Sequence, residues 1–551
     1  MDDRTLPWPE KGSLLMRLFV ARQLSALVLD DCFTDIAPPE GARVLLYNET
    51  DAGLGDVAFA TKLAWLFDAH LPGVELLIVT SDVSKQANFA LPEGVRVIEE
   101  AAFRESGSPE DKAPTMVVSA PGIFDHCRSA KLAYERLGIT EDVPFHYIAE
   151  YGSIRQLKDD AFKAMMPALD ALSERFMDEV AEAHGLAPDD MGHSAKTGAV
   201  VGVFGEELRP LDHLLNAYRD LRDDNPMAAW LRAPLLSARS CGLELGELGI
   251  HLDGEVPWMT PDPAALEGLE DPFVRALLFG GKSPRSYGAE TSLYVGYAYE
   301  GIGLFCDYVS LLEADTPRPL DLVCPHRDRV ANLADIFEPG LRSRLKACGV
   351  GHIEIIGRAP EGELERVDIE LGVGKTMRLI TLYPIPHADF RRLHQAAHPA
   401  TMVSGDQSFS DAVSMGKAIL YLEPVYCQTY HLDAVLELAG ALAPSAREVL
   451  NFGMQYRFDA QAYPALKAKL RSPTLWKDYQ AFNNAIQKEH ACGLRLMNLI
   501  KRALWTLRSP ALRKAASTAL DRAWSEADSE AGVTLKGADL ERLVQSVSEG
   551  S

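Results

Sequence analysis

The chain has 551 residues, of which 47% are hydrophobic and 24% are charged, and its formal net charge is −24. This composition predicts a globular protein of about three to four domain-sized units. The negative charge argues against a nucleic acid as partner, because binding to a phosphate backbone needs clustered Lys and Arg side chains.

No segment has the pattern of a secretory peptide or a membrane span. The chain starts with the acidic Met1-Asp-Asp, and charged or polar residues interrupt the apolar stretch from Leu14 to Leu29. No window reaches the roughly 18 to 20 apolar residues that a membrane span needs. We therefore expect a soluble, cytoplasmic protein without a membrane span.

The cysteines stand singly in the sequence. No two of them lie within three residues of each other; their positions are 32, 127, 241, 306, 324, 348, 427 and 492. This spacing fits neither a zinc-ribbon motif nor a disulfide framework. We expect reduced thiols, most of them buried.

The first part of the chain predicts a helical lead-in over residues 1–40, followed by an α/β domain over residues 41–154. Arg43–Tyr47 is a short buried strand, Val57–Ala69 is an apolar-periodic helix and Val74–Thr80 is the next strand. This is a βαβ unit, and its right-handed crossover places the loop between Asn48 and Asp56 at the carboxyl edge of the sheet. Further strands are expected at Val95–Ile98 and Thr115–Val118.

Long helical periodicity then predicts an inserted or bridging helical region over residues 155–280. A second α/β domain is expected over residues 281–435, and the tail over residues 436–551 has a wholly helical pattern. Strands alternating with helices predict a doubly wound sheet in this second domain. Its expected strands are Thr291–Val295, Leu320–Cys324, His352–Ile356, Met377–Leu382, Thr401–Val403 and Ala418–Leu422.

The predicted fold class is therefore α/β, with two doubly wound, Rossmann-like domains, a helical insertion and a helical C-terminal tail. Open α/β sheets bind ligands at the carboxyl ends of their strands, and interdomain clefts are preferred pockets. We accordingly expect the two sheets to face a cleft that holds the functional site.

The loop Ser404-Gly405-Asp406-Gln407-Ser408 lies between a predicted strand and a predicted helix. Gly405 would allow a ligand close to the backbone, Ser408 could cap the helix, and the first-turn amides could bind phosphate. The alternative is that this loop is only architecture, since every βαβ unit needs a turn and a cap.

A second candidate site is the first loop, where Gly53-Leu-Gly55-Asp56 precedes a helix and Asp51 lies five residues before Asp56. A carboxylate at this position could act as a general base toward an acceptor group. The alternative is that Asp56 only caps the helix, since its charge suits the positive end of the helix dipole.

Two other motifs do not predict sites. Gly372-Val-Gly-Lys375-Thr376 lacks the first glycine of a phosphate-binding P-loop, because position 369 is Ile, so we expect a turn that enters a strand. His394 and His398 are four residues apart and could share a helix face, but no Glu follows His394 as in a zinc-binding HExxH motif. We expect no bound metal ion.

Several stretches resemble, in the same order, the protein-arginine rhamnosyltransferases that modify bacterial elongation factor P, which are GT-B glycosyltransferases. Asp51-Ala-Gly-Leu-Gly55-Asp56 resembles the family's Asp-Asn-x-Gly-Asp-x-Gly, and Glu150-Tyr151 resembles part of its Leu-Glu-Tyr-Leu-Ser. The remaining matches are Thr291-Ser-Leu-Tyr294 with Val-Ser-Leu-Phe, Pro386-His387-Ala-Asp-Phe390-Arg-Arg-Leu393 with Pro-Gln-x-x-Phe-Asp-x-Leu, and Gly405-Asp406-Gln407-Ser408-Phe409 with Gly-Glu-Asp-Ser-Phe.

The resemblance implies a role for each of these residues. Tyr294 and Phe390 would pack on the donor base, His387 would touch its edge, and the 404–408 loop would hold the ribose or diphosphate. Asp56 would be the first candidate base and Asp51 the second. Gly53, Gly55, Glu150 and Tyr151 would lie on the acceptor side.

The expected activity is transfer of a hexosyl or deoxyhexosyl group from a nucleoside diphosphate sugar, with inversion and with no other cofactor. The acceptor would be a protein side chain or a glycan. The sequence departs from the family at Ser404, where the family has Arg, and at Gln407, where it has an acidic residue. These departures leave open a changed donor or a non-catalytic nucleotide-sugar-binding protein. A separate alternative is a nucleotide-sugar epimerase of the same fold.

Overall fold

The computed structural model describes residues 4–6, 26–50, 54–109, 111–121, 133–140, 143–150, 238–243, 246–252, 260–297, 301–326, 330–358, 363–383, 385–422, 430–456, 463–512, 514–515 and 533–535. The chain forms two compact units. Unit 1 contains Met1–His251 and Ala491–Ser551, and unit 2 contains Leu252–His490. The helical insertion predicted over residues 155–280 lies outside the described residues up to residue 237.

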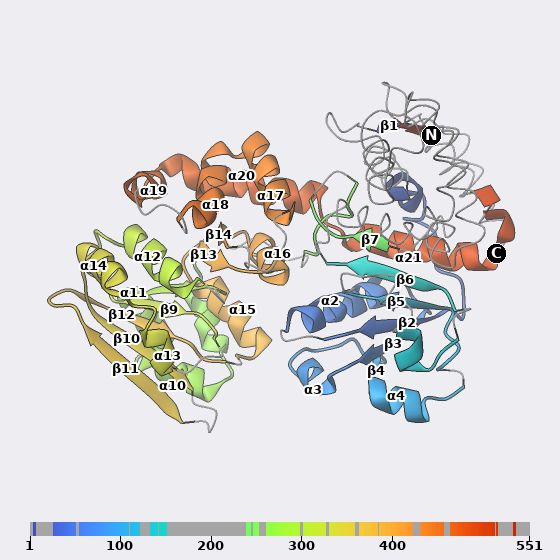
Figure 1. Ribbon diagram of the computed structural model, residues 1–551, viewed down its shortest axis with the longest axis horizontal. Coiled ribbons are helices and arrows are strands. Elements are labelled where there is room, and N and C mark those ends of the chain that lie inside the picture. The colour runs from blue at the N-terminus through green and yellow to red at the C-terminus, as the bar shows by residue number, and fades with distance from the viewer. Residues whose placement is uncertain are drawn as a thin grey trace, which may run out of the picture. The chain divides into compact units, whose positions relative to one another are not determined.

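Unit 1 is built on a parallel sheet of six strands in the order β4-β3-β2-β5-β6-β7 (Figure 1). Numbered along the chain, this is the Rossmann order 3-2-1-4-5-6, in which the direction of winding reverses between β2 and β5. The strands are β2 (Arg43–Asn48), β3 (Glu75–Thr80), β4 (Arg96–Glu99), β5 (Met116–Ser119), β6 (Phe145–Ala149) and β7 (Ala238–Ser240).

Alternate residues of β2 pack into two different cores, as the period of a strand requires. Val44 and Leu46 join the core beneath the helices α2 and α21, and Leu45 joins the core on the opposite face with Phe103 of α4. Unit 1 contains the helices α2 (Gly55–His70), α3 (Val83–Gln86), α4 (Glu100–Ser106) and α21 (Gly493–Arg508).

The C-terminal helix α21 returns to unit 1 rather than continuing the helices of unit 2. Its apolar residues recur at helical spacing and are buried with α2. A buried ion cluster adds to this contact, since Asp30 pairs with Arg502 of α21 at 2.7 Å and with Arg239 of β7 at 3.2 Å. All three side chains are almost inaccessible to solvent.

Two predictions for the ends of the chain need correction. Residues 4–6 form the strand β1 (Arg4–Leu6), although a helical lead-in was predicted there, and β15 (Val533–Leu535) interrupts the tail that was predicted to be wholly helical. The two strands pair with each other in antiparallel orientation. Such pairing between segments more than 500 residues apart leaves no local pattern in the sequence.

Unit 2 contains a sheet in the order β11-β10-β12-β9-β8, in which only the β10–β11 hairpin is antiparallel. A bridge between Tyr297 and Val403 joins β8 to the parallel pair β13–β14. Winding therefore reverses between β8 and β13. The strands are β8 (Ser292–Val295), β9 (Leu320–Val323), β10 (Val350–Arg358), β11 (Leu364–Glu370), β12 (Lys375–Ile380), β13 (Ala400–Val403) and β14 (Ala418–Tyr421).

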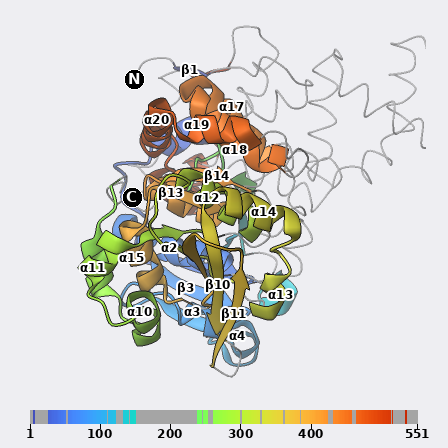
Figure 2. The same ribbon diagram turned by 90° about the vertical axis from the view of Figure 1, so that its left-hand side faces the viewer.

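Helices cover this sheet, and Figure 2 shows its hairpin β10–β11 as the long ribbon at the sheet edge. One core lies between the strands and η3, α10, α11 and α15. The helical elements are η3 (Pro263–Gly268), α10 (Pro272–Phe279), α11 (Pro284–Glu290), α12 (Ile302–Leu312), α13 (Val330–Ala334), α14 (Pro339–Ala347), α15 (His387–Ala396), α16 (Asp406–Ser414), α17 (Tyr430–Leu442), α18 (Pro444–Tyr456), α19 (Tyr463–Leu470) and α20 (Pro473–Glu489).

The helix α10 shows how local sequence sets these boundaries. Asp271 is its N-cap and accepts hydrogen bonds from the backbone N–H groups of Phe273 and Val274, and Pro272 occupies the first turn, where its missing N–H costs nothing. Gly280 ends the helix in the left-handed conformation at φ 53°.

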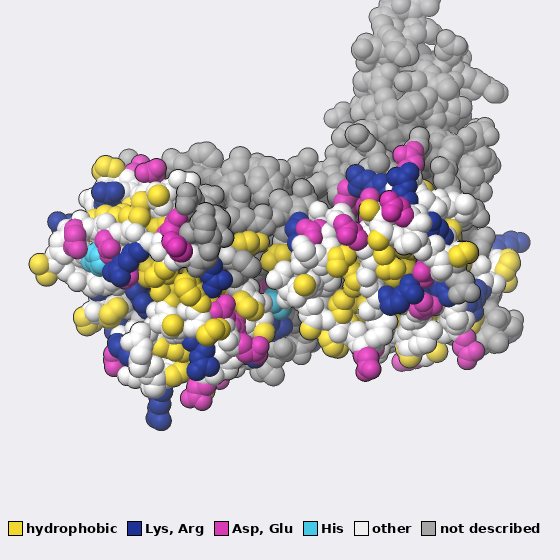
Figure 3. All heavy atoms as spheres, turned by 90° about the horizontal axis from the view of Figure 1, so that it is seen from below, with side chains coloured by type: hydrophobic (Ala, Val, Ile, Leu, Met, Phe, Trp, Pro, Cys, Tyr) yellow, Lys and Arg dark blue, Asp and Glu magenta, His cyan; other side chains and the backbone are white. Residues whose placement is uncertain are grey.

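The structure confirms the predicted fold class of parallel, Rossmann-like α/β sheets with a helical C-terminal region. No described helix is both long and apolar enough to cross a bilayer. Figure 3 shows acidic and basic side chains interspersed over the described surface on that face, and among those residues it offers no continuous basic track for a nucleic acid.

Candidate functional site

In unit 1 the reversal of strand order places the ends of β2 and β5 at the preferred ligand position of an open sheet. Asn48, the last residue of β2, is buried, and its side-chain amide donates to the backbone carbonyls of Asp56 and Ala120, each at 3.1 Å. Asn48 thereby ties the start of α2 to the chain that leaves β5. Asn48 was not among the predicted site residues, although a polar residue directly after a buried apolar run is a signal for such a position.

Asp56 is the second residue of α2 and is half-exposed. The helix begins at Gly55 with Leu54 at the N-cap position, so Asp56 is not the N-cap residue. The positive end of the helix favours the ionised carboxylate, which is the form that a general base needs. Its base role stays a prediction, and the predicted partners Asp51 and Gly53 lie outside the described residues.

Glu150 directly follows β6, at the same carboxyl edge, and is half-buried, whereas Tyr151 lies outside the described residues. The charge of Glu150 affects Cys241, which lies just beyond β7. A hydrogen bond with the Cys492 thiol and burial raise the pKa of the Cys241 thiol, and the charges of Glu150 and Glu247 raise it further. All six described cysteines are free thiols, and five are buried.

In unit 2 the equivalent position lies between the ends of β8 and β13, where Gly405 follows β13. Its φ of 91° and ψ of 162° fall in a region that is almost confined to glycine. A Cβ built on Gly405 would meet no heavy atom within 4 Å, so the backbone is open to approach. Ser404, just before it, is buried, and its N–H donates to the Tyr297 carbonyl at 2.7 Å.

The helix α16 begins directly after this glycine, and the prediction that Ser408 caps it is wrong. Gly405 occupies the N-cap position, where no side chain can bond the first turn. The Ser408 hydroxyl instead donates back to the carbonyls of Ser404 and Gly405, each at 2.8 Å, because its place in the first turn directs it there. The start of α16 therefore has no side-chain cap, and an anion could bind its amides.

The first residue of α16 is Asp406. Burial raises the pKa of its carboxyl to about 7, although the Tyr421 hydroxyl, 3.4 Å away, works in the opposite direction. A carboxyl with this pKa is half neutral near pH 7. Gln407, which follows it, is buried at 8% exposure.

His387 and Phe390 lie at the start of α15, after the end of β12, and both are half-buried. The Phe390 ring packs edge-to-face on His394, with centroids 4.7 Å apart. Strand order places β12 three strands from β13, which is about 14 Å at the usual strand spacing. His387 and Phe390 thus share the carboxyl edge with Gly405 but lie some distance along it.

Tyr294 is placed differently from the other predicted donor-binding residues. It lies inside β8 with 0% exposure, its hydroxyl donates to Glu313 at 2.7 Å, and its ring lies 4.7 Å from that of His398. No face of the ring is open to a donor base. The expected packing of Tyr294 on that base therefore has no support from the geometry.

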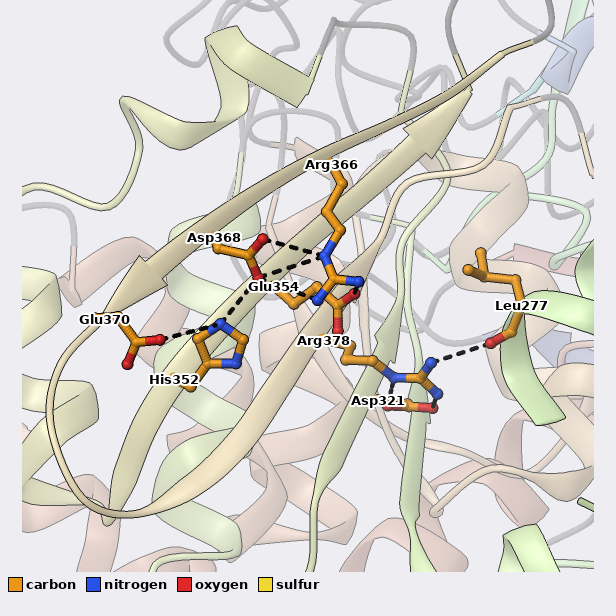
Figure 4. Close-up of polar contacts among 8 residues, drawn as sticks. All are labelled: Leu277, Asp321, His352, Glu354, Arg366, Asp368, Glu370 and Arg378. Atoms are coloured by element: carbon orange, nitrogen blue, oxygen red, sulfur yellow. Dashed lines mark hydrogen bonds and ion pairs between the residues drawn. The ribbon is translucent and has the colours of Figure 1, made fainter. Parts of the chain in front are cut away.

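A group of charged contacts on the strands β9 to β12 lies away from this edge (Figure 4). His352 lies 2.9 Å from Asp368 and 3.8 Å from Glu370 across the hairpin, near the amino end of β10. Arg378 pairs with Asp321 and also donates to the Leu277 carbonyl at 3.0 Å, near the end of α10. These contacts hold the hairpin and α10 on the sheet, and their position argues against a ligand site.

The Gly372–Thr376 segment and the pair His394 and His398, which were not predicted to be sites, have structural positions. Lys375 is the first residue of β12, as the turn prediction requires, and its buried ammonium donates to the carbonyls of Glu313 and Thr316. His398 lies beyond the end of α15 at Ala396, so it does not share a helix face with His394. Within the described parts of the chain, no three His, Cys, Asp or Glu side chains are grouped to hold a metal ion.

The chain matches no protein-family model and no curated protein. It is similar to three solved structures among others. The glycosyltransferase VinC in complex with dTDP is 12% identical with a TM-score of 0.36, over 84% of this chain and 99% of that one. Alr3699/HepE of Anabaena with UDP and glucose is 8% identical with a TM-score of 0.34, over 83% and 97%. EarP, whose structure explains arginine glycosylation of the elongation factor EF-P, is 15% identical with a TM-score of 0.33, over 83% and 97%. Similarities this distant assign neither a family nor an activity.

Proposed function

We propose that this protein is a GT-B glycosyltransferase that uses a nucleoside diphosphate sugar as its donor. The observation that carries the proposal is the start of α16. An open glycine in a conformation almost confined to glycine precedes a helix without a side-chain cap, at the point where strand order reverses.

The donor would lie along the carboxyl edge of unit 2. Its diphosphate would bind the first-turn amides of α16 behind Gly405, and its base would lie near His387 and Phe390. The separation of about 14 Å between the ends of β12 and β13 suits an extended nucleotide better than a compact anion. Asp406 could hold the ribose or the diphosphate, depending on its protonation.

Asp56 would accept the proton of the acceptor nucleophile. That nucleophile would attack the anomeric carbon while the bond to the diphosphate breaks on the opposite face, which inverts the configuration. The amides and the positive end of α16 would stabilise the leaving diphosphate without calling on a metal ion. By the sequence resemblance, the transferred group is a hexose or deoxyhexose and the acceptor is a protein side chain, with a glycan as the alternative.

Donor binding is tested first, by thermal unfolding of the full chain with a panel that includes UDP- and dTDP-sugars. A donor at a hundredfold excess over its Kd should stabilise the protein by about 2.7 kcal/mol. No shift with any donor would reject the proposal.

The Asp56→Ala variant then tests the chemistry. Removing a general base should slow transfer by about 10² to 10⁴-fold and leave the donor Kd unchanged. The matched control is Asp68→Ala, since Asp68 is an exposed acid at the other end of the same helix. Equal rates in the two variants would remove Asp56 from the mechanism.

Two further outcomes would replace the proposal. Donor binding without turnover across donors and acceptors would indicate a non-catalytic nucleotide-sugar-binding protein. A free epimerised sugar nucleotide formed without any acceptor would indicate an epimerase.

A further inference from the structure

The helix α15 has two different flanks. On the first, Asp389 accepts hydrogen bonds from the backbone N–H groups of Glu270 and Asp271, and Arg392 pairs with Glu270 at 2.9 Å. Gln395 continues this flank with a contact to Asp262 at 3.3 Å. These contacts fix this flank to the segment around η3, so Arg392 has a structural role.

The opposite flank carries His387, Arg391 and His394, which are spaced by four and three residues and therefore share one helix face. His394 is buried beside Lys417, whose ammonium donates to the His394 carbonyl at 2.5 Å. Burial and the positive charges of Lys417, Arg391 and His387 hold the pKa of His394 well below its usual value. The charges that act on His394 are all cationic, and one of them is that of Arg391.

This second flank faces the side of the sheet that carries α16. Lys417 lies between α16 and β14, which places His394 and its neighbours on that side. The connections from β12 to β13 and from β13 to β14 run in the same direction across the sheet, so right-handed crossovers put α15 and α16 on the same face.

Arg391 lies in the second turn of α15. The helix α15 begins at the carboxyl edge of the sheet, and helical side chains lean toward the N-terminus of their helix. We therefore expect the half-buried Arg391 to lean toward that edge, where Gly405 opens the start of α16.

The departures from the resembling motifs are complementary in charge. Where those motifs have Arg before the glycine of the 404–408 loop, this chain has Ser404, and where they have Asp after the Phe, this chain has Arg391. The loop has lost a cation and the neighbouring helix has gained one. A guanidinium can bind a diphosphate through two parallel hydrogen bonds.

We infer that Arg391 binds the donor diphosphate and makes this site select nucleoside diphosphates over monophosphates. The inference rests on the proposed function and adds a specificity-determining residue to it. Arg391 would contact the second phosphate, which a monophosphate lacks. The preference for a diphosphate should therefore depend on Arg391 and not on the adjacent Arg392.

The test measures the Kd of UDP and UMP, or of dTDP and dTMP if the wild type prefers thymidine nucleotides, by titration calorimetry on the full chain. Arg391→Ala should weaken diphosphate binding by about 10 to 100-fold, the usual range for a lost charge-assisted contact, and should change monophosphate binding by less than about threefold. Arg391→Gln keeps the Cβ, Cγ and Cδ positions and a polar end without the charge, and it should show the same loss, which covers a folding defect in the alanine variant.

The matched control is Arg392→Ala, which removes the same charge from the other flank and should leave the ratio of the two Kd values unchanged. The inference would be overturned if the ratio of the monophosphate Kd to the diphosphate Kd were unchanged in both Arg391 variants, or if it fell equally in Arg392→Ala. In either case, nucleotide binding by the wild type would still support the proposed function. A wild type that binds no nucleotide would instead reject the proposed function, and the inference with it.

Discussion

Raising the pH from about 6 to about 8 should weaken the binding of a nucleotide sugar to unit 2. The group responsible is Asp406, the first residue of α16, whose pKa burial raises to about 7. The diphosphate of a nucleotide sugar is a diester that stays anionic over this range. An ionised Asp406 would repel it at the start of the helix, whereas a protonated carboxyl can donate a hydrogen bond to it.

The size of the effect follows from the protonated fraction. With a pKa of about 7, roughly nine-tenths of the carboxyl is protonated at pH 6 and roughly one-tenth at pH 8. If the diphosphate binds only the protonated form, the apparent Kd rises by about tenfold, which is about 1.4 kcal/mol. The positive end of α16 favours the ionised form, and where the dipole lowers this pKa a larger rise is expected over the same pH range, because a smaller fraction of the carboxyl is then protonated at pH 8.

The same proton affects folding stability. The pKa of Asp406 in the folded state lies above its ordinary value of 3.8, so the folded state holds the proton more tightly than the unfolded state does. The contribution of Asp406 to the free energy of unfolding therefore falls as the pH rises from about 4 to about 7, and it stays lost above that.

The assay is calorimetric titration of the best-binding nucleotide sugar at a series of pH values. Asp406→Asn removes the titrating group, so its Kd should not change across the range. Asp411→Asn removes the same charge beyond the first turn of α16 and should keep the slope of the wild type. A flat profile in the wild type, or an unchanged slope in Asp406→Asn, would refute the reasoning.

Three other substitutions have expected outcomes. Gly405→Ala forces a backbone conformation that alanine avoids and should lower the free energy of unfolding by about 1–3 kcal/mol in urea, with weaker nucleotide binding. Asn48→Ala leaves two carbonyls without their donor and should cost about 1–3 kcal/mol and slow transfer, whereas Asn88→Ala, at an exposed site, should do neither. Asp30→Asn leaves two buried arginines without a counter-charge and should lower the stability of unit 1 by about 3–5 kcal/mol, measured by urea unfolding; a loss below about 1 kcal/mol would contradict this account of the ion cluster.

Most strands of the parallel sheets could be predicted from the sequence, because strands buried on both faces read as short apolar runs. The pattern at Arg43–Tyr47 predicted β2 to within one residue of its end. The hairpin strand β11 was missed, since Leu364–Glu370 alternates apolar and charged residues at an exposed sheet edge. The three-residue strand β7 is too short for any periodicity.

Side-chain environments were harder to predict than strand positions. Tyr294 and Val295 are adjacent in β8, but Val295 belongs to the core with α15, whereas Tyr294 bonds Glu313 at the end of α12. Which face each residue takes depends on the register of the whole sheet. The same limit applies to α21: the tail was predicted to be helical, but nothing in its sequence says which unit this helix covers.

A missing side-chain cap cannot by itself identify the donor site, because α4 and α12 also begin without one. The start of α16 differs in what accompanies it. The strand order reverses there, Gly405 adopts a conformation almost confined to glycine with nothing close to it, and the first carboxyl titrates near neutral pH. A purely structural turn needs none of these together, since a serine or aspartate cap would stabilise the helix by about 1 kcal/mol with less strain. Together these features support the proposal that a ligand binds at the start of α16, where its oxygens would accept hydrogen bonds from the first-turn N–H groups.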